Sequence, residues 1–230
     1  QTFHVDGWRT RHPNLKTLNQ HFTEQGFNTI GLGKIYHGNN GPGVDPKNWT
    51  QWVKMKGVPH YAKKENIDIL NKALAEIKQD DEHNPPKGPM TESADVHDDT
   101  YTDGKTTAKT VEILKNLGEN KEKPFFLYIC TSDPHRGGGS ANELPYKPDR
   151  FGNPKPGSKG YSGIKEVIYD PAKVNVPGFL PDTPTCRAEI AQYYQSVSRV
   201  DQGIGRLIEI LKETGKWEDT LFLFIADHGI

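Results

Sequence analysis

Three short apolar runs stand out along the chain, at residues 29–33, 124–130 and 221–226. Runs of this length are typical of strands. The last two are continuously apolar rather than alternating, which indicates parallel strands covered on both faces. The pattern therefore predicts buried strands in a mainly parallel sheet.

Helical spacing precedes each of these runs. Segments 14–25, 104–117 and 183–214 place apolar residues at steps of three and four, and Thr183 or Thr185 can cap the longest of them. A glycine follows each segment, as expected at a helix C-terminus: Gly26, Gly118 and Gly215. The order of helix then strand, repeated three times, predicts an α/β fold in which helices sandwich a mainly parallel sheet.

Composition excludes some classes of function. Lys and Arg number 29 against 30 Asp and Glu, so no cationic excess points to nucleic acid. No apolar run approaches the roughly 20 residues that span a bilayer, so we expect no membrane span and a soluble segment. Two cysteines, Cys130 and Cys186, are too few for a disulfide framework and lack metal-site spacing. Frequent glycine and proline, with long loops at 38–59 and 137–181, fit an enzyme.

A polar cluster follows each predicted strand. Because parallel strands bring their C-terminal ends to one edge of a sheet, side chains from the three clusters could converge there. The candidates are Lys34, His37, His135, Arg136, Asp227 and His228.

This set of side chains suits a particular chemistry. Asp227 and His228 offer an oxygen and an imidazole to a divalent cation. Lys34 and Arg136 offer fixed positive charge, and a histidine could protonate a leaving group near neutral pH. Cations with a metal fit a substrate that has several anionic oxygens, such as a sulfate or phosphate ester.

Each cluster by itself also has an ordinary interpretation. A Gly-Lys or an Asp-His-Gly after a strand is often only a turn, and Asp133-Pro134 could be a turn whose Asp side chain bonds to the backbone. Paired Asp98 and Asp99 favour a capping or solvated role. The remaining histidines are interpreted as surface or structural residues: His4, His12, His21, His60, His83 and His97. Spacing alone does not separate a sulfatase from a phosphatase.

Longer segments carry a family resemblance. Residues 15–37, with their Gly-Lys-x-x-His motif, residues 124–135 with PFFL and Pro-His, and residues 191–228 resemble three segments of the sulfatase family, in the family's order. The Gly-Lys-Ile-Tyr-His motif and residues 89–96 look like iduronate-2-sulfatase relatives. Asp-Pro-His-Arg and residues 169–184 look like heparan N-sulfatase, or sulfamidase, members, and this second match is the longer one.

The resemblance implies an alkaline-phosphatase-like fold and a role for each candidate. Lys34 would bind a sulfate oxygen, and His37 would contact the aldehyde-hydrate nucleophile. His135 would bind sulfate and protonate the leaving group, with Arg136 as a further substrate contact. Asp227 and His228 would ligate a calcium ion, although many sulfatases have Asn where His228 stands.

The chain departs from the family pattern at both ends. The family's nucleophile is a formylglycine made from the Cys or Ser of Cys/Ser-x-Pro-x-Arg. Neither cysteine stands in such a motif, since Cys130 is followed by Thr-Ser-Asp and Cys186 by Arg-Ala-Glu. We therefore expect residues 1–230 to be part of a single sulfatase catalytic domain that is incomplete at both ends and inactive alone. The nucleophile is expected in a preceding segment and the rest of the sheet in a following one. The resemblance also implies a formylglycine-generating maturation enzyme as partner and a secreted, periplasmic or lysosomal location.

Three functions follow as expectations. The leading one is hydrolysis of a sulfate ester or sulfamate on a carbohydrate resembling a glycosaminoglycan. A second is a phosphodiesterase or phosphonate hydrolase of the same superfamily, which would need a Thr or Ser nucleophile and usually two metals. A third is an inactive sulfatase-like domain that only binds a sulfated glycan, since Lys34 and Arg136 would serve binding equally well.

Overall fold

The computed structural model describes residues 8–35, 45–55, 61–76, 92, 94–119, 123–134 and 162–226. The chain divides into two compact units. The first unit comprises residues 1–57, 106–132 and 206–227 and contains the sheet. The second comprises residues 58–105, 133–205 and 228–230. Each unit is described by itself below.

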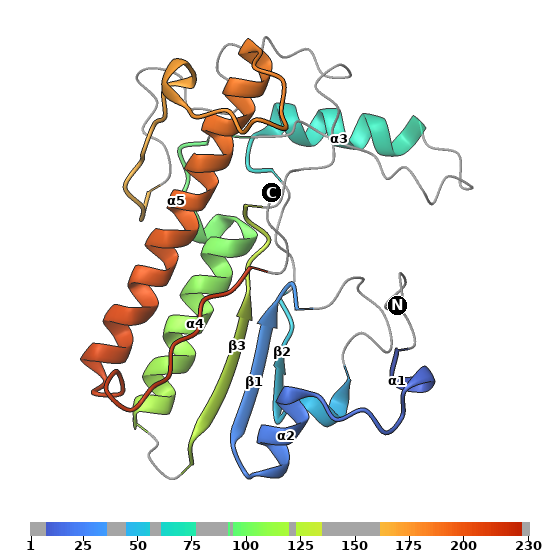
Figure 1. Ribbon diagram of the computed structural model, residues 1–230, viewed down its shortest axis with the longest axis vertical. Helices are drawn as coiled ribbons and strands as arrows, with labels where there is room; N and C mark the ends of the chain where they lie inside the picture. Colours follow the sequence, from blue (N-terminus) through green and yellow to red (C-terminus); the bar gives the residue numbers. More distant parts are fainter. Residues whose placement is uncertain are drawn as a thin grey trace. The chain divides into compact units, whose positions relative to one another are not determined.

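The first unit is built on a parallel sheet of three strands in the order β2-β1-β3 (Figure 1). The strands are β1 (Asn28–Gly33), β2 (Gln51–Val53) and β3 (Phe125–Cys130). Six consecutive residue pairs join β1 to β3, from Asn28 with Phe125 to Gly33 with Cys130. The first two predicted strands and their parallel pairing are thus confirmed, whereas β2 was not predicted.

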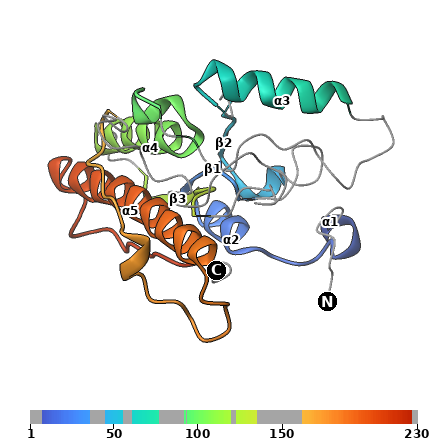
Figure 2. The ribbon, with the colours of Figure 1, turned by 90° about the horizontal axis from the view of Figure 1, so that it is seen from above.

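Helices cover both faces of this sheet, as predicted. On one face, Ile30 and Leu32 pack with Ile113 of α4 (Thr102–Glu119), and Leu127 joins the same cluster. On the other face, Phe22 of α2 (Leu18–Glu24) stacks on Phe126 with ring centroids 4.7 Å apart. Figure 2 shows α2 and α4 on opposite sides of the strands.

The largest core cluster of the first unit joins α4 to the last turns of α5 (Pro184–Glu213). Leu114 of α4 packs with three residues of α5, and β3 contributes partly buried side chains beneath them. The α5 members are Leu207, Ile210 and Leu211. Burial of these aliphatic side chains is the main stabilising contribution in this part of the molecule, at roughly 1.5–3 kcal/mol each.

The ends of α2 and α5 follow the expected capping chemistry, whereas Gly118, a predicted helix end, lies inside α4. Thr17 accepts a hydrogen bond from the Gln20 amide, 3.1 Å away, at the start of α2, so this helix begins later than predicted. Thr183 accepts from the Cys186 amide at 3.2 Å at the start of α5, which identifies the cap of the longest helix. Gly26 follows α2 and Gly215 follows α5, both with positive φ.

The second unit contains a helix that was not predicted, α3 (Lys64–Glu76), and most of α5. Residues 162–183 lie along α5, where Val174 packs on Ile190 and Ala191. The remaining short helices of the described chain are α1 (Trp8–Arg11), η2 (Pro46–Asn48), η3 (Asp98–Thr100) and η4 (Pro171–Lys173).

The third predicted strand is wrong. Residues 221–226 have no strand assignment, and Leu221 and Phe224 are 82% and 70% exposed. Only Phe222 packs on the core, beside Trp217. Apolar character predicted burial, but a strand also needs a neighbour that hydrogen-bonds to it, and none of the described strands pairs with this segment.

Two smaller expectations can be compared with the structure. Cys130 and Cys186 are both free thiols. None of the helices in the described residues combines the length and apolarity that a bilayer crossing requires.

Candidate functional site

The C-terminal ends of β1 and β3 meet at one edge of the sheet, as predicted. Gly33 is the register partner of Cys130, and the Lys34 amide donates to the Cys130 carbonyl at 2.9 Å. Gly33 has φ +83°, and a β-carbon there would lie 1.9 Å from the Cys130 carbonyl oxygen. Only glycine permits this close approach, so the Gly of Gly-Lys has a local structural reason.

Lys34 lies directly after this contact, at the carboxyl edge of the sheet. Its side chain is exposed, and within the described residues its ammonium forms no ion pair. The backbone is fixed by β3 while the charged end stays in solvent, which suits a group that binds an incoming anion.

The other predicted site residues lie outside the described residues: His37, His135, Arg136, Asp227 and His228. Because residues 221–226 do not form a strand, the third sheet edge that was to bring Asp227 and His228 toward Lys34 is missing from the described sheet. The convergence of the six residues therefore stays a prediction.

A cluster of charged residues in the second unit was not predicted. Arg199, in the middle of α5, donates from Nη2 to Oδ1 of Asp98 at 3.0 Å and from Nη1 to Oδ2 of Asp133 at 3.3 Å. The Asp133 amide donates in turn to Oδ2 of Asp103 at 2.6 Å. Of the capping or solvated role predicted for Asp98, the solvated alternative is wrong, because Asp98 is 6% exposed. Asp99 beside it is exposed.

Three carboxylates lie around one guanidinium, and this arrangement favours protonation of Asp133. Burial raises the pKa of Asp133 to about 6, against the attraction of Arg199, and repulsion from Asp103 and Asp98 acts in the same direction as burial. Asp133 therefore changes charge near neutral pH. Asp133 lies in a turn, as one interpretation predicted, and its carboxylate accepts a hydrogen bond from Arg199.

A second set of contacts supports Arg199 through the ring of Tyr101. The guanidinium lies over the Tyr101 ring, 5.9 Å from its centroid, and the Tyr101 hydroxyl donates to Glu92. Glu92 also accepts from the amides of Ala62 and Lys63 at 2.6 and 3.0 Å, ahead of α3. Burial alone would raise the pKa of Glu92, but these hydrogen bonds outweigh it and hold the pKa below its usual value.

One sequence signal could have found Arg199. Gln195, Arg199 and Gln202 follow one another at steps of four and three, so they share one face of α5. The prediction for this helix rested instead on its apolar residues. Of these, Ile190, Leu207 and Leu211 are buried, whereas Val197 is 40% exposed.

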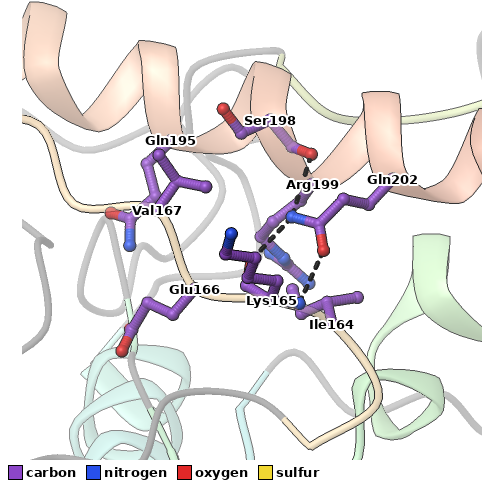
Figure 3. A pocket seen from close by; sticks show the side chains of 8 residues that line it. All are labelled: Ile164, Lys165, Glu166, Val167, Gln195, Ser198, Arg199 and Gln202. Carbon is purple, nitrogen blue, oxygen red and sulfur yellow. Dashed lines mark hydrogen bonds between the residues drawn. The ribbon is translucent and has the colours of Figure 1, made fainter.

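This polar face of α5 borders a small pocket (Figure 3). Gln202 holds the facing segment in both directions, because its Nε2 donates to the Lys165 carbonyl at 2.7 Å and its Oε1 accepts from the Lys165 amide at 2.6 Å. Arg199 lines the same pocket. Lys34 is not among the residues that line it.

The described residues contain no group of three His, Cys, Asp or Glu side chains placed to hold a metal ion. The predicted ligands, Asp227 and His228, lie outside that part of the chain. His97, predicted to be a surface or structural residue, is exposed and forms a β-bridge with Ser162.

The comparison with protein families decides the assignment. A family model described as "Sulfatase" matches residues 3–230. The chain belongs to the sulfatase family. The parallel sheet covered by helices fits the alkaline-phosphatase-like fold that the resemblance implied.

Two curated sulfatases illustrate the similarity. N-sulphoglucosamine sulphohydrolase of Homo sapiens is 39% identical over 118 residues, 51% of this chain and 24% of that protein. Iduronate 2-sulfatase of Homo sapiens is 25% identical over 248 residues, 96% of this chain and 42% of that protein. The chain thus spans less than half the length of either relative. The solved structure of Ps i-CgsB in complex with k-i-k-neocarrahexaose aligns with TM-score 0.46 and 18% identity, covering 86% of this chain and 36% of that one.

Proposed function

We propose that the natural protein containing this sulfatase chain hydrolyses a sulfate ester or sulfamate on a carbohydrate. The observation that carries the proposal is the family match over residues 3–230. The placement of Lys34 supports it, because an exposed ammonium stands at the carboxyl edge of a parallel sheet, where α/β enzymes bind their ligands.

Each site residue has a chemical task in this proposal. Lys34 would bind an oxygen of the sulfate and balance its charge. His135 would protonate the leaving oxygen or nitrogen, while Arg136 would contact the substrate. His37 would contact the nucleophile, which in this proposal would be a formylglycine hydrate made by a maturation enzyme.

Asp227 and His228 would hold one divalent cation, with calcium as the expected ion. A carboxylate oxygen fits calcium well, and the imidazole of His228 fits it less well, since calcium prefers oxygen ligands. The cation would draw negative charge from the sulfate oxygens. A secreted, periplasmic or lysosomal location belongs to the same proposal.

The comparisons favour a sulfamate over a 2-O-sulfate. Identity with N-sulphoglucosamine sulphohydrolase is 39% over 118 residues, and identity with iduronate 2-sulfatase is 25% over 248 residues; the names of both refer to sugars. We therefore propose an N-sulfated amino sugar as the preferred substrate.

The test measures sulfate release by the natural protein from glucosamine N-sulfate and from a 2-O-sulfated uronate, and hydrolysis of a phosphate diester to a monoester and an alcohol. Lys34→Ala and His135→Ala should each lower kcat/KM by at least about a hundredfold, since each removes a charge or proton that is needed in the transition state. Wild-type rates in both variants would reject the site assignment.

Lys123→Ala is the matched control. Lys123 is also exposed, but it precedes β3 and so lies at the opposite end of that strand from Cys130 and Lys34. Its removal should leave the rate unchanged. Hydrolysis of the phosphate diester alone would support the phosphodiesterase alternative, and binding without turnover would support an inactive glycan-binding domain.

A further inference from the structure

We propose that Arg199 is a positioning residue for the reaction, which anchors Asp133 and thereby the chain two residues ahead of His135. The proposal rests on the proposed function for the role of His135. It assigns to α5 a task that neither the family match nor the predicted site residues give it.

The anchoring contacts come from three elements of the second unit. Arg199 of α5 bonds to the Asp133 side chain at 3.3 Å, and Asp103 of α4 accepts from the Asp133 amide at 2.6 Å. Asp98 of η3 bonds to the other nitrogen of the guanidinium at 3.0 Å. Asp133 is thus held by both its backbone and its side chain, although these partners are far from it in sequence.

Arg199 is itself held in one orientation. Its side chain is only 19% exposed, the Tyr101 ring lies beneath the guanidinium, and Asp98 is buried beside it. A planar guanidinium that bridges two carboxylates fixes both direction and distance, which a lysine ammonium does not. The arrangement therefore has the rigidity that an anchor needs.

The link to catalysis is the short stretch of chain after this anchor. His135 follows Asp133 by two residues, so a shift of Asp133 moves the backbone that carries the proposed proton donor. Displacements of about 1 Å in a catalytic group can reduce a rate by about a hundredfold. Arg199 does not need to touch the substrate to affect kcat.

The anchor also has a charge requirement. The groups that face Asp133 are Arg199 from α5, Asp103 from α4 and Asp98 from η3. Arg199 is a cation that offsets the repulsion between these carboxylates. Its removal would leave Asp133 protonated at a higher pH and would weaken the contacts that hold the segment.

The experiment compares Arg199→Met, Arg199→Lys and Arg187→Met in the natural protein. Arg187 is the matched control, because it lies on the same helix and forms an ion pair with Asp182, away from Asp133. The measurements are kcat and KM for sulfate release from glucosamine N-sulfate between pH 4 and 8, and hydrogen exchange of the Asp133 amide.

Arg199→Met should lower kcat at least about tenfold with little change in KM, and should move the acid limb of the kcat profile to higher pH. Arg199→Lys should restore the acid limb and part of kcat, and Arg187→Met should behave as wild type. Wild-type kcat and pH profile in Arg199→Met would overturn the proposal, as would equal losses in Arg199→Met and Arg199→Lys.

Hydrogen exchange separates this inference from the proposed function. Faster exchange of the Asp133 amide in Arg199→Met than in Arg187→Met supports the anchor even if the wild-type protein releases no sulfate, in which case only the proposed function fails. Equal exchange in the two variants overturns the anchor whatever the protein hydrolyses.

Discussion

The carbonyl oxygen of Cys130 lies 1.9 Å from the point where a β-carbon on Gly33 would stand. The obstacle is backbone of the paired strand, which the β1–β3 ladder holds in place. Gly33 also has φ +83°, a conformation that side chains with a β-carbon disfavour by roughly 1–2 kcal/mol.

Gly33→Ala should therefore lower the free energy of unfolding by more than about 3 kcal/mol, as strain and a backbone clash add together. Gly26→Ala is the matched control, because Gly26 has φ +84° with open space around its α-carbon. It should lose only about 1–2 kcal/mol. Urea denaturation of both variants measures the difference, and equal losses would refute the steric account.

Gly31 also lies against a neighbour, but here a side chain is the obstacle. A β-carbon on Gly31 would stand 2.8 Å from the ring of Trp49, which is buried over β1. Gly31→Ala should lower stability by about 1–3 kcal/mol. In a Trp49→Leu background the same change should be milder by about 1 kcal/mol or more, and a double-mutant cycle measures this coupling. Strict additivity would show that the ring is not the obstacle.

Sequence patterns predicted the elements whose neighbours are dictated by hydrophobicity. The buried stripe of α5 and the apolar runs of β1 and β3 pack in the same core, because each of them has apolar side chains to bury. The three residues of β2 give too short a pattern to detect. Residues 221–226 show the opposite failure, because an apolar run predicts burial but does not provide the pairing strand.

The candidate site was predicted in part for the same reason. Gly33 and Lys34 follow from the order of strand and turn, and the structure places them beside Cys130. Arg199 and its carboxylates depend on contacts between residues as far apart as positions 98 and 199. No local period encodes such a meeting, and only the spacing of polar residues on α5 hints at it.

The α5 helix offers a direct comparison of buried and exposed aliphatic positions. Leu211 is 3% exposed and packs within the core cluster that contains Leu114, whereas Val197 is 40% exposed. Leu211→Ala should lower the free energy of unfolding by about 2–5 kcal/mol, because it removes packed methyl groups and leaves a cavity. Val197→Ala should change it by less than about 0.5 kcal/mol. Thermal unfolding of both proteins would show whether the stripe is buried as described.

Glu92 gives a prediction whose size depends on pH. Its Oε1 accepts from the Ala62 amide and the Tyr101 hydroxyl, and its Oε2 accepts from the Lys63 amide and the Asn66 side chain. Gln in this place has one acceptor oxygen, so two donors would face an NH2 group. Glu92→Gln should therefore lower stability at pH 7 by on the order of 1–3 kcal/mol.

The sign of the pH dependence follows from the lowered pKa of Glu92. The ionised carboxylate stabilises the folded state above its unfolded pKa near 4.5, and this contribution is lost as pH falls through the lower folded value. The stability difference between wild type and Glu92→Gln should accordingly shrink below about pH 4.5. Glu112→Gln, which removes an exposed pair with Lys109, should show a difference near zero at every pH. Urea denaturation from pH 3 to 7 would contradict this account if the Glu92→Gln difference grew toward low pH.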